Sequence, residues 1–201
     1  MSFNKVLLAA LAAVSTTANA ATINFTGNLA NHNDVITTTF TLNSAATNVR
    51  VWTDSYKNGI NFDPITALWN AATGQLIDED DDNASVNPAT QTRYDSGFTI
   101  ASLAAGTYYF TVATYNNFAK GSNIADGFAY DNDTPLALNQ WCQPANHCNM
   151  GTSWSVWLDG VDRASNPSDP GEVPEPGSIA LLGLGLTGLA LSRKRKRQTQ
   201  A

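Results

Sequence analysis

The sequence carries an acidic run, DEDDDN at positions 78–83, that places five carboxylates within six residues. Carboxylates at this density repel one another unless a cation relieves the repulsion. Calcium is the natural cation, because it is a hard ion that takes roughly six to eight oxygen ligands. A helix-loop-helix calcium loop is excluded, since Asn83 stands where that loop needs Gly and Ala89 where it needs a bidentate Glu.

A calcium site in this chain must therefore combine the acidic run with a second loop. Asp63, in the motif FDP, is the residue that we expect to join Asp80, Asp81 and Asp82. The alternative is an acidic, solvated turn at the end of a strand. Calcium is the one cofactor that the sequence suggests.

Tryptophans are a second group of residues with a chemical use. They stand at positions 52, 69, 141, 154 and 157, and exposed rings of this kind stack on sugars. Trp52 and Trp157 fall opposite the strand faces expected to point inward, so they are the candidate ligand-binding residues. The alternative is packing, in which a strand or a long loop covers both rings.

The two cysteines, Cys142 and Cys148, lie six positions apart in a loop-like stretch of a chain with export features. Oxidation to a local disulfide is the leading interpretation. A metal site that recruits His147 is the alternative, but it would have only three soft ligands and no matching second pair.

Catalysis is not predicted. The sequence contains no G-x-S-x-G, H-E-x-x-H or P-loop motif, and only His32 and His147 are available as imidazole bases. Histidines in Asn-rich loops of this kind are expected to be polar surface residues.

The middle of the chain must supply the scaffold for these groups. Short apolar alternations are separated by Asn, Asp, Gly and Pro, without a helical stripe, which predicts an all-β, jelly-roll-like antiparallel β-sandwich of about eight strands. The candidate strands are 22–26, 35–42, 48–53, 65–69, 75–78, 97–103, 107–115 and 153–158, with a tight hairpin at NAATG, 70–74. The expected inward residues are Phe40, Leu42, Val49, Val51, Phe98, Ile100, Tyr108, Phe110, Val112, Trp154, Val156 and Leu158.

The N-terminus has the features of a signal peptide at 1–20. Lys5 precedes the apolar core Val6–Val14, and Ala18 and Ala20 form a small-x-small cleavage site. The sandwich is then expected at 21–160 and a flexible Pro/Ser/Asp stalk at 161–172. Between residues 21 and 172, 16 acids and 5 bases give a formal charge of −11, so nucleic acid and anionic lipid are poor partners.

The C-terminal tail, 173–201, has three parts. An expected membrane helix at 177–192 is short for a bilayer span, and basic residues follow as a stop-transfer signal that stays in the cytoplasm. Before the helix, two prolines hold Glu175 in extended, accessible backbone. The basic residues are Arg193, Lys194, Arg195, Lys196 and Arg197.

These three parts together resemble the PEP-CTERM sorting signal of Gram-negative bacteria, in which Val173, Pro174, Glu175 and Pro176 match the recognition box. The resemblance implies recognition by an exosortase, a transient single-pass anchor in the inner membrane, removal of the tail, and delivery to the cell surface or exopolysaccharide matrix. An ordinary single-pass anchor behind a Pro-rich stalk is the alternative.

The domain ahead of the tail also carries a resemblance. FDPITALWNAATGQLIDEDDDN followed by AAGTYYFTVATYNN is similar to exported β-sandwich domains of the bacterial pre-peptidase C-terminal type, which implies an accessory domain without catalysis. We expect a structural or adhesive surface or biofilm-matrix protein. The alternative is an exopolysaccharide-binding module that uses Trp52 and Trp157, with or without calcium.

Overall fold

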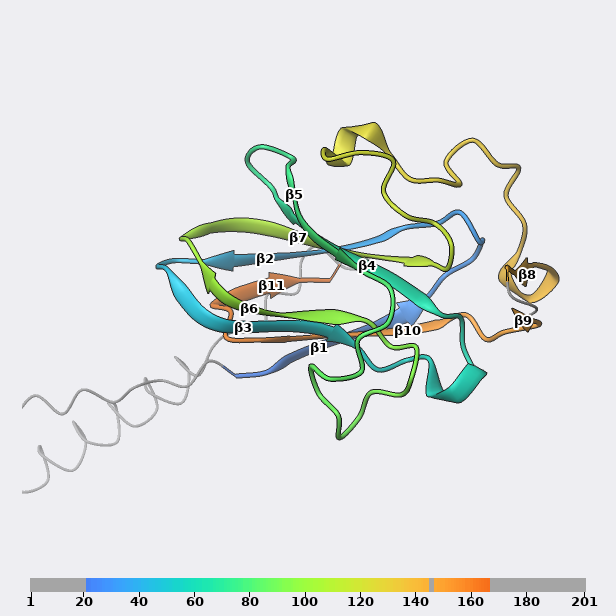
Figure 1. Cartoon of the computed structure of the whole chain (residues 1–201), viewed down its shortest axis with the longest axis horizontal. Coiled ribbons are helices and arrows are strands. Elements are labelled where there is room, and N and C mark those ends of the chain that lie inside the picture. Colours follow the sequence, from blue (N-terminus) through green and yellow to red (C-terminus); the bar gives the residue numbers. More distant parts are fainter. Residues whose placement is uncertain (1–20, 145–146, 167–201) are drawn as a thin grey trace, which may run out of the picture.

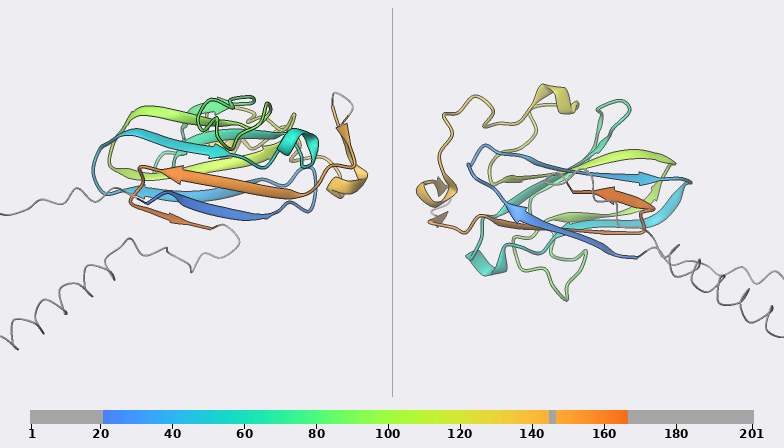
Figure 2. Two further views of the ribbon diagram at one scale, coloured as in Figure 1. Left: turned by 90° about the horizontal axis from the view of Figure 1, so that it is seen from below. Right: turned by 180° about the vertical axis from the view of Figure 1, so that it is seen from behind.

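Two antiparallel sheets pack face to face in the computed structural model, which describes residues 21–144 and 147–166 (Figure 1). The four-stranded sheet has the order β1 (Ile23–Asn28), β10 (Ser153–Asp159), β3 (Ala46–Thr53) and β6 (Gly97–Leu103). The five-stranded sheet has the order β11 (Arg163–Ser165), β2 (Ile36–Leu42), β7 (Gly106–Thr114), β4 (Pro64–Asn70) and β5 (Leu76–Asp80). The two layers are visible edge-on in Figure 2, and the all-β sandwich prediction is confirmed.

The chain crosses between the sheets at nearly every connection. Among the strands of the two sheets, β4 and β5 are consecutive in the sequence and also lie in the same sheet, where they form a hairpin. The other neighbours come from distant parts of the sequence, for example β1 beside β10, where Phe25 faces Val156. This alternation gives the sandwich its jelly-roll-like character.

All eight predicted strands are present, with ends that shift by two residues or less. Three short strands were not predicted. Two of them, β8 (Cys142–Gln143) and β9 (His147–Cys148), form a separate hairpin, and the third is β11. The short 3-10 helices are η1 (Lys57–Gly59), η2 (Ile124–Asp126) and η3 (Leu138–Gln140).

Strand β11 corrects the predicted domain boundary. The stalk was expected at 161–172, but Arg163–Ser165 pair with Thr39–Thr41 of β2, and Val161 and Ala164 are buried. The sandwich therefore extends at least to Ser165. Three residues cannot show a strand alternation, and the Pro- and Ser-rich sequence that follows them obscured the signal.

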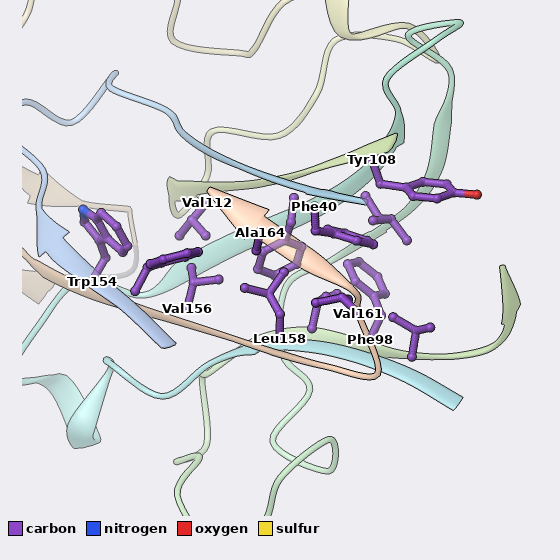
Figure 3. Close-up of a cluster of buried hydrophobic side chains, with 14 of the residues drawn as sticks. Phe40, Phe98, Tyr108, Val112, Trp154, Val156, Leu158, Val161 and Ala164 are labelled. Atoms are coloured by element: carbon purple, nitrogen blue, oxygen red, sulfur yellow. The ribbon is translucent and has the colours of Figure 1, made fainter. Parts of the chain in front are cut away.

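The main core lies between the sheets and includes the inward residues that the alternation predicted. Phe98 of β6 meets Phe110 of β7 edge to face at 6.3 Å, and Phe40 stacks on Tyr108 at 5.3 Å between ring centroids. Figure 3 shows β10 contributing Trp154, Val156 and Leu158 to the same cluster. Because every expected inward residue is buried or packed against this cluster, the face assignment is confirmed.

Both outer faces are partly covered by long loops. On the five-stranded sheet, Trp69 and Phe128 form a second apolar cluster, in which Phe128 comes from the loop after β7. On the four-stranded sheet, the β5–β6 loop, residues 81–96, contains the buried Val86, whose carbonyl accepts a hydrogen bond from Arg50 of β3. Positions opposite the core are therefore not all exposed.

The predicted signal peptide, 1–20, and the predicted sorting tail, 173–201, lie outside the described residues. Within residues 21–144 and 147–166, no helix combines the length and apolar character needed to cross a bilayer.

Candidate functional site

The β4–β5 hairpin positions the candidate acids. At its turn, Asn70 Oδ1 accepts hydrogen bonds from the N–H groups of Ala72 (2.9 Å) and Thr73 (3.2 Å), and Gly74 adopts a φ of +73°. Gly tolerates this left-handed conformation without steric cost. Thr66 pairs with Asp80 near the other end of the hairpin, so the residues before β4 and after β5 meet there.

Three carboxylates converge at this open end, which we call the carboxylate site: Asp63, Asp81 and Asp82. One oxygen from each lies within 4.8 Å of the other two. Asp63 is buried with 6% of its surface exposed, Asp81 is half-buried and Asp82 is exposed. The site thus runs from the protein interior to solvent.

Hydrogen bonding at the carboxylate site is incomplete. Asp63 Oδ2 accepts a hydrogen bond from Gln143 Nε2 at 3.3 Å, whereas Asp63 Oδ1 is buried and has no partner. Asp81 Oδ1 is also buried and unpartnered. A buried acceptor without a donor costs free energy, so these two oxygens need a proton or a cation.

The raised pKa values of Asp63 and Asp81 also indicate that the site needs a proton or a cation. Burial, together with the charges of Asp81 and Asp82, raises the pKa of Asp63 from 3.8 to about 8. Burial also raises the pKa of Asp81 to about 6, with further contributions from Asp82 and Asp80. Each carboxylate therefore disfavours the ionisation of its neighbours.

Asp80, which was expected to join Asp63, is not a member of this group. Burial raises the pKa of Asp80, and hydrogen bonds from the Asn83 side chain and from the backbone of Asp81 and Asp82 oppose that rise. Asp80 is the last residue of β5 and is still paired with Thr66 of β4, whereas Asp81 and Asp82 follow the strand. Of the four predicted ligands, the structure brings Asp63, Asp81 and Asp82 together and leaves Asp80 outside the group.

A second aspartate, missed by the sequence analysis, anchors the β5–β6 loop. Asp95 is fully buried, and its carboxylate accepts hydrogen bonds from Tyr56 N–H (3.0 Å), Thr92 N–H (2.7 Å) and the Thr53 hydroxyl (3.3 Å). Two of these donors, Thr53 and Tyr56, lie at or just after the end of β3, and the third, Thr92, belongs to the β5–β6 loop itself. Asp95 thereby fixes the loop that carries Asp81 and Asp82, and its isolated position in the sequence gave no signal of that role.

The β8–β9 hairpin closes the site from the other side. The predicted disulfide between Cys142 and Cys148 is confirmed, so neither sulfur is available for the alternative metal site with His147. Gln143, the next residue, is 2% exposed and holds Asp63. The disulfide-bonded hairpin therefore contains Gln143, the side chain that orients the buried Asp63 carboxylate.

The two candidate ligand-binding tryptophans have different environments. They face each other across β3 and β10, with ring centroids 6.0 Å apart and planes inclined by 7°. Trp157 is partly exposed, but Trp52 is only 2% exposed. Trp52 is therefore too buried to stack on a ligand. Trp157 lies parallel to its ring, and the guanidinium carbon of Arg50, which also donates to Val86 O of the β5–β6 loop, lies 5.3 Å from its ring centroid.

His32 was expected at the surface and is instead 3% exposed. Its Nδ1 accepts a hydrogen bond from Leu136 N–H at 3.3 Å, and its Nε2 lies 3.6 Å from Asp133 Oδ2. Its ring is also 5.3 Å from that of Tyr130 and 5.2 Å from that of Trp141. His32 thus secures the long loop after β7 to the sandwich.

Comparison with known proteins identifies the tail. The family model of the PEP-CTERM protein-sorting motif matches residues 172–196, a range that contains the VPEP box and four of the five basic residues. No curated protein matches the chain. The match covers the tail alone, so the sandwich is characterised by its own geometry.

Proposed function

We propose that this chain, which carries a PEP-CTERM protein-sorting motif, is an exported cell-surface or extracellular-matrix protein with a structural or adhesive role. The motif supports sorting by an exosortase to the outside of the cell. The single observation that carries the proposal is the motif match at 172–196. In the proposed route, the tail holds the chain in the inner membrane only until the exosortase has processed it.

Features of the sandwich are consistent with an extracellular destination. The Cys142–Cys148 disulfide persists in an oxidising compartment. The acidic chain, with a sequence pI of about 4.6, is suited to a hydrated matrix rather than to nucleic acid. Both features support a durable component of the surface or of a biofilm matrix.

We assign the sandwich a non-catalytic role. His32 and Asp95 are both used in packing and loop anchoring, through the contacts described above. A structural or adhesive function requires a stable scaffold and an exposed surface, and these contacts serve stability.

Exopolysaccharide binding is the second candidate, and Trp157 is the residue that favours it. Its ring lies on the outer face of β10, partly exposed and supported by the parallel ring of Trp52. A ring held in this way is a platform for a sugar face. Loss of binding to the host polysaccharide in Trp157→Ala, with the fold retained, would favour this role over a purely structural one.

The sorting proposal is tested by changing the box in the native host. In Glu175→Ala we expect the protein to accumulate in the inner-membrane fraction, as it should in a strain without the exosortase. Asp169→Ala, which removes an acid outside the matched range 172–196, is the matched control and should reach the surface normally. Normal surface delivery of Glu175→Ala and of the wild type in the exosortase-free strain would refute the proposal.

A further inference from the structure

The carboxylate site has the composition of a metal site without a compensating protein cation. The ion pairs recorded among the described residues join Arg50 to Asp159 and His32 to Asp133, so neither involves a member of the site. Arg93 is close enough to lower the pKa of Asp82, the exposed member, but it makes no ion pair there. Within the described part of the chain, the buried Asp63 and the half-buried Asp81 form no ion pair with a basic residue.

The second observation is the unpartnered oxygen of Asp63. Asp63 is only 6% exposed, and its Oδ2 already accepts a hydrogen bond from Gln143. Its Oδ1 has no donor, although the carboxylate lies within 4.8 Å of two others. A buried acceptor without a donor costs free energy, and among like charges a bound cation relieves that cost directly.

We propose that Asp63, Asp81 and Asp82 bind one calcium ion at the open end of the β4–β5 hairpin. All three donors are carboxylate oxygens, with no imidazole or thiolate among them, which suits a hard cation and not zinc. Three acids at one ion favour calcium over magnesium, because magnesium keeps most of its water and uses one or two carboxylates. Water completes the coordination on the exposed side, at Asp82.

The ion would connect three separate segments of the chain. Asp63 leads into β4, Asp81 and Asp82 begin the β5–β6 loop, and Gln143 ties Asp63 to the disulfide hairpin. That loop also accepts, at Val86 O, a hydrogen bond from Arg50, whose guanidinium lies over Trp52 on the four-stranded sheet. Calcium therefore holds this loop in place, and its removal loosens the loop first. This inference does not depend on the sorting proposal, since the site lies entirely within the sandwich.

A proton is the competing occupant. In the absence of an ion, the raised pKa of Asp63 lets it stay protonated near neutral pH, which would relieve part of the repulsion. The two occupants are distinguishable, because only calcium binding depends on added metal. The test must therefore separate an acid pair that shares a proton from a site that takes an ion.

The experiment is isothermal titration of the purified full chain with calcium chloride after removal of metal by a chelator, at pH 7.5. We expect one ion per chain with a Kd on the order of 10⁻⁴ M, as in extracellular calcium modules. At a calcium concentration about 100 times Kd, the unfolding equilibrium constant should fall about 100-fold, measured by urea denaturation. Magnesium at the same concentration should have a much smaller effect.

Two variants and a control locate the ion. Asp63→Asn and Asp81→Asn preserve the side-chain shape, and circular dichroism establishes that each is folded. Both variants should bind calcium with a Kd at least tenfold higher than that of the wild type. Asp78→Asn, which removes an exposed acid of β5 outside the site, should keep the wild-type Kd. The proposal is overturned if the wild type shows no response at 10 mM calcium, or if both variants bind as tightly as the wild type.

Discussion

Asp63 and Gln143 exchange two hydrogen bonds across 80 positions of sequence. Gln143 Nε2 donates to Asp63 Oδ2, and Asp63 N–H donates to Gln143 Oε1, each at 3.3 Å. One residue precedes β4 and the other lies beside the disulfide, so this amide joins the carboxylate site to the β8–β9 hairpin. The orientation of the Asp63 carboxylate therefore depends on the β8–β9 hairpin, which lies far from the acidic run in the sequence.

Removal of that amide should destabilise the fold. Gln143→Ala leaves Asp63 N–H and Oδ2 without their partner in a buried site, so we expect a loss of about 1–3 kcal/mol in the free energy of unfolding. Urea denaturation in a chelator measures it. Gln140→Ala, at an exposed position of η3, is the matched control and should change stability by less than about 0.5 kcal/mol. Equal effects of the two changes would contradict the structural role of Gln143.

The metal-free protein should lose stability as the pH rises from about 4 to about 8. The pKa of Asp63 is raised from 3.8 to about 8, so within this window the unfolded chain has released a proton that the folded chain still holds. The unfolding free energy then falls by up to about 1.4 kcal/mol per pH unit. The contribution is fully present below pH 4 and is lost above pH 8.

The neighbouring carboxylates raise the pKa of Asp63 as burial does, and one hydrogen bond opposes them. Asp81, Asp82 and Asp95 raise the pKa of Asp63, and the hydrogen bond from Gln143 lowers it. Urea denaturation at pH 5 and pH 8 in a chelator measures the slope, and Asp63→Asn should flatten it. Stability that rises between these two pH values, or a slope unchanged in Asp63→Asn, would disagree with this environment.

The paired tryptophans should differ in their contribution to stability. Trp52 is almost completely buried, so Trp52→Ala should cost about 3–5 kcal/mol. Trp157 is partly exposed on the same face, and Trp157→Ala should cost about 1–2 kcal/mol. Urea denaturation compares the two variants. A larger loss for Trp157 than for Trp52 would contradict the burial of Trp52.

Gly97 should not accept a side chain. Its φ of +152° is unfavourable for other residues, and a Cβ atom would lie 2.6 Å from Trp52 Cα in the neighbouring strand. We expect Gly97→Ala to lower the unfolding free energy by at least about 2 kcal/mol. Gly106→Ala is the control, because its Cβ would find its nearest neighbours at 3.7 Å. A melting temperature of Gly97→Ala equal to that of the control would contradict the register of β3 with β6.

The strands were predictable because alternation reports directly on burial between two sheets. Residues such as Phe40 and Phe110 follow a period of two, and the core needs no other information. Asp63 could be associated with the acidic run because both flank one hairpin, whose turn is marked by Asn70 and Gly74. Local signals of this kind extend over a single supersecondary unit.

The remaining features depend on long loops. Alternation placed Trp52 outside the core, but only the tertiary structure shows that Arg50, which donates to Val86 O of the β5–β6 loop, lies over its ring. The roles of Asp95 and Gln143 likewise come from contacts between distant segments, which no residue pattern records. Asp80 was grouped with Asp81 and Asp82 because the strand was predicted to end at 78, whereas β5 continues through Asp80.

The measurement that tests the account most directly is the intact mass of the mature protein purified from its native host. Export and exosortase processing predict a mass that lacks residues 1–20 and also lacks the tail beyond the VPEP box at 173–176. The same preparation from an exosortase-free strain should retain the tail. A mature mass that extends to Ala201 in the wild-type host would contradict the proposed route.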